Sequence, residues 1–129
     1  MEHYKELLHI RFAEKVMGWT QIEPSRESGG LKFYGIVQTG KGPQRLAVPD
    51  YSHDLDAMWA AEQYLKRCGR AGAYLRALAE VTGATDLADP EELFKLVSAS
   101  PAERCEAGLR AHESSGGGFT ESDSTQAIQ

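Results

Sequence analysis

The sequence predicts a single α+β domain, because it combines three helical segments with a central β-hairpin. Residues 2–17, 52–67 and 101–112 place apolar side chains at the spacing of one helix face. Residues 31–38 instead alternate between an apolar and a mixed face, and residues 45–48 can return beside them as a partner strand. Helices and antiparallel strands in separate parts of a chain are typical of an α+β layer structure.

Length, charge and apolar content limit what this domain can be. The chain has 129 residues, 41% of them apolar, which suffices for a modest core. Its 14 basic and 19 acidic side chains give a net charge of −5, which argues against a non-specific nucleic-acid binder. No apolar run approaches the roughly 20 residues that cross a bilayer. Cys68 and Cys105 lack the spacing of a disulfide framework or a zinc site. We therefore expect a cytoplasmic protein with reduced thiols and no membrane contact.

The first helix has a clear apolar side and a clear end. Leu8, Phe12 and Val16 recur at helical spacing, and Gly18 stands where a helix can stop in a left-handed conformation. Residues 24–30 are polar and contain proline and glycine. They predict a connection between the first helix and the hairpin.

The second helix follows the hairpin, whose turn is expected at residues 39–43. Ser52 is the expected N-cap, and Asp54 in the first turn suits the positive end of the helix dipole. Trp59 on this helix and Trp19 before the hairpin are both expected to lie in the core.

Two later segments stay ambiguous from local signals. Residues 74–81 have a helical composition, which favours a helix, but they lie between Gly72 and Gly83. Residues 89–92, Asp-Pro-Glu-Glu, are typical of a helix start, whereas residues 94–99 alternate as a strand does.

The last helix carries the strongest local signal. Ser100, Pro101 and Glu103 form a capping box with proline at the first helical position. The helix is expected to bury Ala102, Cys105 and Leu109. Gly108 weakens a helix, and close packing of the helix, for example on a sheet, would explain why glycine stands there. The domain is expected to span residues 1–113, and residues 114–129 to form a flexible, disordered, Gly/Ser-rich acidic tail.

The familiar catalytic motifs are missing from the sequence. There is no Walker-type phosphate loop, G-x-G-x-x-G after a strand, G-x-S-x-G or H-E-x-x-H, and the four histidines have no metal-ligand spacing. The polar cluster from Asp50 to Asp56 has two interpretations. It either caps a helix, or it forms a pocket rim where Tyr51 stacks on a base and Ser52 or Asp54 holds a ribose hydroxyl. Arg104 and Arg110 have two interpretations as well. They either bind an anionic ligand or belong to a solvated helix surface.

Three segments, residues 13–19, 48–58 and 96–111, resemble the phage ABA sandwich domain family in their residues and their order. The resemblance spans roughly residues 7–113 and implies an antiparallel sheet between helical layers. It also implies that residues 94–99 are a strand. The chain departs from the family at Glu106, where many members have Arg, so an anion-binding role would move to Arg104 or Arg110.

The first type of Thoeris anti-defence proteins are similar to this family and bind cyclic ADP-ribose signals without cleaving them. The resemblance therefore implies a phage protein in the cytoplasm of the host bacterial cell. It would be a homo-oligomer that sequesters a nucleotide immune signal, with no catalytic residue, metal or cofactor. The ligand-binding residues expected on this basis are Phe33, Tyr34, Tyr51, Ser52, Asp54, Arg104 and Arg110. Two alternatives stay open: a module that blocks a host protein, and a nucleotide-cleaving enzyme using His53 with Asp50 or Asp54 as acid and base.

Overall fold

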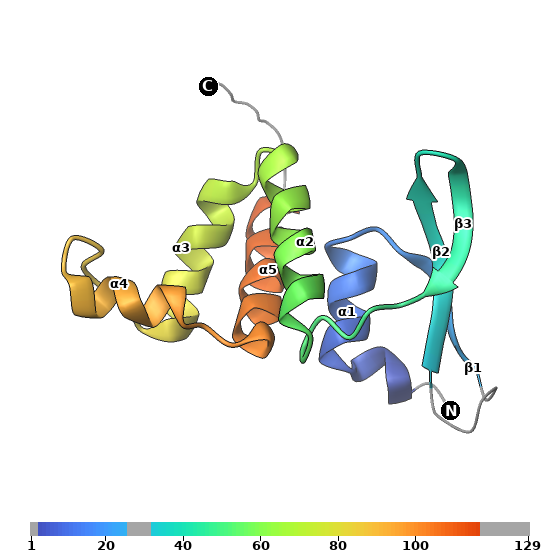
Figure 1. Ribbon diagram of the computed structural model, residues 1–129, viewed down its shortest axis with the longest axis horizontal. Helices are drawn as coiled ribbons and strands as arrows, with labels where there is room; N and C mark the ends of the chain where they lie inside the picture. Colours follow the sequence, from blue (N-terminus) through green and yellow to red (C-terminus); the bar gives the residue numbers. More distant parts are fainter. Residues whose placement is uncertain (1–2, 26–31, 117–129) are drawn as a thin grey trace.

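The computed structural model describes residues 3–25 and 32–116. A short 3₁₀ helix, η1 (His3–Glu6), leads into α1 (Leu8–Lys15) and three strands, and four further helices complete the described part of the chain (Figure 1). The strands are β1 (Thr20–Ser25), β2 (Lys32–Thr39) and β3 (Gly42–Ala47); the later helices are α2 (Leu55–Arg67), α3 (Ala71–Thr82), α4 (Pro90–Val97) and α5 (Pro101–Gly116). None of the helices in these ranges is both long and apolar enough to cross a membrane.

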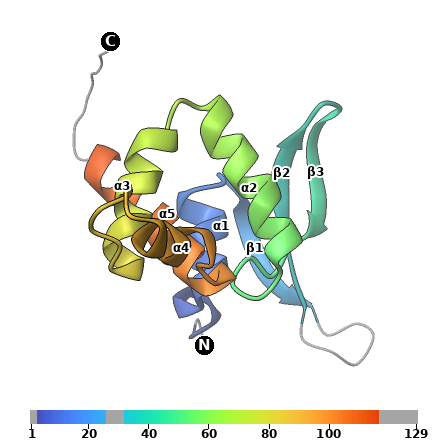
Figure 2. The ribbon, with the colours of Figure 1, turned by 60° about the vertical axis from the view of Figure 1, so that its left-hand side comes forward.

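The sheet confirms the predicted α+β class with antiparallel strands. Its order is β1-β2-β3, with the central strand β2 antiparallel to both neighbours. Phe33 of β2 is buried, and a Cβ on Gly35 would lie 2.9 Å from the Ile22 side chain, so only glycine fits there. The resemblance implied helices on both sides of the sheet. In the described part the helices gather on one side of it, in both views (Figures 1 and 2).

The core lies between the sheet and the helices and within the helical body. Its largest fully buried side chains come from α1, α2, α3 and α5: Ile10, Phe12, Met58, Leu78 and Cys105. In Figure 1, α1 stands next to the sheet and α5 runs through the middle of the helices. A Cβ on Gly108 of α5 would lie 2.5 Å from the Phe12 ring. The close packing expected at Gly108 is therefore against helix α1.

One predicted strand is wrong, and one predicted helix is confirmed. Residues 94–99 do not form a strand, because α4 runs through Pro90–Val97. The Asp89 side chain accepts from the Glu91 amide, and Pro90 stands in the first turn, so the helix start outweighs the short alternation after it. The helix favoured for residues 74–81 is confirmed as α3, which ends at Gly83 in a left-handed conformation with φ of 81°.

Strand β1 is absent from the predicted elements, because a proline such as Pro24 favours a connection over a strand. Proline is tolerated in an edge strand, and β1 is the edge next to β2. Its register with β2 shifts between Thr20 and Glu23, where Gln21 has a φ of 53°. Residues 26–31 of the predicted connection lie outside the described residues.

The helix ends differ in detail from the prediction. Asp54, not Ser52, caps α2, since its carboxylate accepts from the amides of Asp56 and Ala57. The capping box of Ser100 and Glu103 is confirmed by reciprocal hydrogen bonds of 2.8 and 3.1 Å. Helix α5 continues past the expected end to Gly116, so it includes the first three residues of the predicted tail. The rest of that tail, residues 117–129, lies outside the described residues.

Candidate functional site

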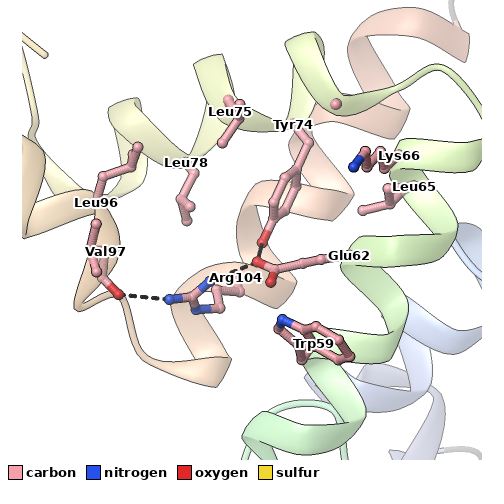
Figure 3. Close-up of a pocket in the computed structure, with 11 residues that line it drawn as sticks. Trp59, Glu62, Leu65, Lys66, Tyr74, Leu75, Leu78, Leu96, Val97 and Arg104 are labelled. Carbon is pink, nitrogen blue, oxygen red and sulfur yellow. Dashed lines mark hydrogen bonds and ion pairs between the residues drawn. The ribbon is translucent and has the colours of Figure 1, made fainter.

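An apolar groove of about 400 Å³ opens between α2 and α3, with the end of α4 and the start of α5 closing it (Figure 3). Its lining residues come from all four helices: Trp59, Glu62, Leu65, Lys66, Ala71, Tyr74, Leu75, Leu78, Leu96, Val97 and Arg104. Leu65 and Leu78 are buried at its base.

The walls of the groove expose large apolar side chains. Trp59 of α2 is 63% exposed and Val97 of α4 is 62% exposed, and Leu75 of α3 is nearly half exposed. Trp59 was expected in the core, which is wrong. The buried stripe of α2 runs through Met58, Ala61 and Leu65, and Trp59 lies beside that stripe. Its indole is the largest apolar surface that the groove presents to solvent.

The polar floor of the groove is a set of three side chains that satisfy one another. Arg104 Nη1 donates at 2.7 Å to Glu62 Oε2, and the Tyr74 hydroxyl donates to the same oxygen. The guanidinium also donates from Nε to the Ala99 carbonyl and from Nη2 to the Val97 carbonyl, each at 2.9 Å. Arg104 and Glu62 are only 15% and 16% exposed. The ion pair therefore joins α5 and the end of α4 to α2.

The electrostatics of the floor favour binding over proton transfer. Burial, the hydrogen bond to Glu62 and the charge of Glu62 together raise the pKa of Tyr74 well above its ordinary value. Tyr74 therefore stays a neutral donor near pH 7. Because the carboxylate and the guanidinium are engaged with each other, the walls offer a ligand mainly apolar area. Lys66 adds an exposed ammonium at the rim.

The aromatic residues predicted to stack on a ligand lie elsewhere. Phe33 is buried and stacks on Tyr4, with ring centroids 5.5 Å apart. Tyr51 is buried against Phe12, and burial raises the pKa of its hydroxyl. Tyr34 lies partly exposed on the sheet, and the Arg45 guanidinium lies 5.7 Å from its ring centroid. Phe33 and Tyr51 are only 7% and 5% exposed, so their own chain covers most of each side chain in this conformation.

The polar cluster before α2 is held together by its own hydrogen bonds. Ser52 Oγ donates to Asp50 Oδ1 at 2.7 Å, and His53 Nδ1 lies 3.0 Å from Asp50 Oδ2 and 3.1 Å from Ser52 Oγ. Burial raises the pKa of Asp50, but the hydrogen bonds and the nearby histidines outweigh it and lower the pKa overall. In a nucleophilic triad, one histidine nitrogen faces the serine and the other faces the carboxylate. Here a single nitrogen faces both, so the serine is not aligned for activation.

The two candidate arginines differ in their surroundings. Arg104 belongs to the groove floor, whereas Arg110 pairs on the exposed side of α5 with Glu106 at 3.2 Å and with Glu80 at 3.9 Å. Of the seven predicted ligand-binding residues, only Arg104 lines the groove. Tyr51, Ser52 and Asp54 are together only because they are neighbours in sequence.

Trp59, Leu75 and Val97 line the groove but are not among the predicted ligand-binding residues. A signal was present, because each of these helices carries more apolar positions than one buried stripe requires. Within the described ranges, no three His, Cys, Asp or Glu side chains are grouped to hold a metal ion. Comparisons with protein-family models, curated proteins and solved structures gave no match. The resemblance to the phage family therefore stays a prediction.

Proposed function

We propose that the protein is a non-catalytic binding module whose groove receives the apolar side of an amphipathic helix from a protein partner. The observation that carries this proposal is the open apolar wall of Trp59, Leu75 and Val97 above a polar floor that needs no further partner. Exposed apolar side chains that converge on one hollow are typical of interaction sites.

The size of the groove suits side chains from one face of a helix. An α-helix with its side chains is about 10–12 Å wide. A hollow of about 400 Å³ holds a few large side chains but not a whole helix. Helix-in-groove recognition uses anchors at i, i+3, i+4 and i+7, which fits such a hollow.

The charges near the groove predict the flanks of the partner helix. Lys66 lines the groove with an exposed ammonium near the end of α2, although the chain as a whole is acidic. Local charge at a binding surface decides orientation and approach more than net charge does. The preferred partner therefore has carboxylates beside its apolar stripe.

Calorimetric titration with a synthetic peptide tests this function. The probe carries Leu and Phe at i, i+3, i+4 and i+7 with Glu between them, and the control peptide has the same composition with the stripe scrambled. Leu75→Arg is expected to weaken binding at least about tenfold, roughly 1.4 kcal/mol. Leu46→Arg, at another exposed leucine on β3, is expected to leave it unchanged. Equal binding of both peptides, or equal loss in both variants, would overturn the proposal.

A second candidate function is the sequestration of a nucleotide signal, as the resemblance implied. The observation that favours it is that the exposed indole of Trp59 and the ammonium of Lys66 line one groove, since a base stacks on an aromatic face and an ammonium pairs with phosphate. Titration with cyclic ADP-ribose isomers and cyclic dinucleotides tests it, with Trp59→Ala and Lys66→Ala expected to weaken binding. No heat across that panel, or a nucleotide recovered cleaved, would remove this candidate.

A further inference from the structure

Helix α4 is amphipathic but has no buried residue. Leu93, Phe94, Leu96 and Val97 cover one side of it, and Glu91, Glu92 and Lys95 cover the other. Phe94 is 68% exposed, and Leu93 and Val97 are also open to solvent. Only Leu96 packs, partly buried, against the core. A helix with an apolar side normally buries it, but among residues 3–25 and 32–116 no segment covers this one.

Despite its exposure, α4 is held in a defined place. Its start is capped by Asp89, and Glu92 Oε1 accepts from the Thr85 amide at 2.9 Å. Lys95 pairs with Glu92 at 2.9 Å, and the Val97 carbonyl accepts from Arg104. The uncovered side chains are therefore presented from a fixed helix.

The apolar side of α4 adjoins the groove, since Val97 belongs to both. We propose that a second copy of this chain covers this face, with Phe94 of each copy entering the groove of the other, next to Leu75. This inference rests on the proposed function, because it names a partner for the same groove.

A second copy fits because the projecting side chain and the hollow lie on one face. A two-fold pair then makes the same contact twice, and no complementary surface is left open. Helix α4 also has the chemistry expected of the partner helix: an apolar stripe flanked by carboxylates.

Charge on the face supports the same arrangement. Asp86, Asp89 and Glu91 are exposed at the start of α4, which lies at the outer end of the molecule in Figure 1. Lys66 of α2 is the exposed cation of the groove, and it lies across the groove from Val97 at the end of α4 (Figure 3). A two-fold pair places the acidic end of one copy toward Lys66 of the other, which is favourable.

The area of the face approaches that of a specific pair. A large aromatic side chain buries about 150–250 Å², so covering Trp59 and Phe94 in both copies removes on the order of 400–650 Å² from water. The exposed leucines and valines of both copies bring the total toward the roughly 1,200 Å² of a stable interface.

Sedimentation equilibrium over a concentration series tests the inference. The full chain is expected to dimerise, and Phe94→Asp and Leu75→Arg are each expected to weaken dimerisation at least about tenfold, because a charge would be desolvated in the groove. Leu46→Asp on β3 is the matched control and is expected to dimerise as the unmodified chain does. Circular dichroism of each variant shows whether it is folded.

A mixture of the two variants sharpens the test. In a mixed pair, one Phe94 still enters an intact groove, and Asp at 94 meets Arg at 75 in the other. Native mass spectrometry of equal amounts is therefore expected to show a mixed dimer in excess of either single-variant dimer. A dimer that persists in Phe94→Asp, or the absence of a mixed dimer, would overturn the arrangement.

The result also separates this inference from the proposed function. If the chain stays monomeric at all concentrations but binds the synthetic amphipathic peptide, the second-copy inference is wrong and the proposed binding groove stands. A chain that dimerises through Phe94 but ignores the peptide has a groove selective for its own α4. If the chain neither dimerises nor binds the peptide, both proposals are wrong.

Discussion

The Arg104 guanidinium of α5 donates at 2.7 Å to the Glu62 carboxylate of α2, 42 residues away in sequence. The same guanidinium holds the carbonyls of Val97 and Ala99 at the end of α4. One side chain therefore connects three of the helices that form the groove. The position of α4 relative to Trp59 depends on it (Figure 3).

Loss of that guanidinium is expected to be costly. Arg104→Met leaves the buried Glu62 carboxylate without its counter-charge and two carbonyls without donors. We expect the free energy of unfolding to fall by about 3 kcal/mol. Urea denaturation measures it, with Arg110→Met as the control, because Arg110 makes only exposed pairs and should cost less than about 0.5 kcal/mol. Equal losses in the two variants would contradict the role assigned to Arg104.

Gly108→Ala is expected to destabilise the fold although alanine favours helices. The added Cβ would lie 2.5 Å from Phe12, a fully buried ring with little room to move. Overpacking of this kind costs about 1–3 kcal/mol. Gly72→Ala is the matched control in α3, since the nearest atom to its Cβ is 3.6 Å away at the flexible end of Arg76. That change should be neutral or stabilising by up to about 1 kcal/mol; thermal unfolding of both variants compares them.

Stability is expected to fall as the pH rises above 9. Burial raises the pKa of the Cys105 thiol from its ordinary 9.0 to about 12. The folded chain therefore keeps a proton that the unfolded chain releases, so the stabilisation is complete below pH 9 and is lost as the pH rises toward 12. Cys105→Ala should flatten this decline, whereas Cys68→Ala, at an exposed thiol, should not. Urea midpoints at a series of pH values provide the measurement, and identical declines in both variants would refute the assignment.

The two thiols are expected to differ in reactivity. Cys68 is exposed and Cys105 is buried beside Met58, with the two sulfur atoms 3.8 Å apart. Near pH 8, an excess of a thiol reagent should modify Cys68 rapidly and Cys105 only after denaturant is added. Peptide mapping identifies the site, and rapid modification of Cys105 in the folded chain would show that the helical core is open.

The sequence predicted those elements whose signals are local. The capping box of Ser100 and Glu103 needs only four consecutive residues, and the β2–β3 hairpin needs only its turn and alternation. The strand expected at residues 94–99 was wrong because so few alternating residues fit both the strand period and the helix period. The Asp89 cap favours the helix. Strand β1 was missed because a proline is compatible with a sheet only at an edge, and edge position is a tertiary property.

The groove was less predictable than the fold because it depends on long-range contacts. Glu62, Tyr74 and Arg104 come from three helices, and no local pattern indicates that they meet. Trp59 and Val97 line the groove from two helices, and the Val97 carbonyl is held by Arg104 from a third. The predicted residues Tyr51 and Phe33 are aromatic residues used by the core, and their chemistry alone does not distinguish that use from ligand stacking.

The most direct measurement of the central claim is the map of amide and indole chemical-shift changes in ¹⁵N-labelled protein during titration with the amphipathic peptide. If the groove is the binding surface, the changes concentrate at the Trp59 indole N–H and at the amides of Leu75, Leu96 and Val97. The amides of β3 and of the cluster around Asp50 stay unchanged. Changes centred on the sheet or on Asp50, with the Trp59 indole unmoved, would contradict the account.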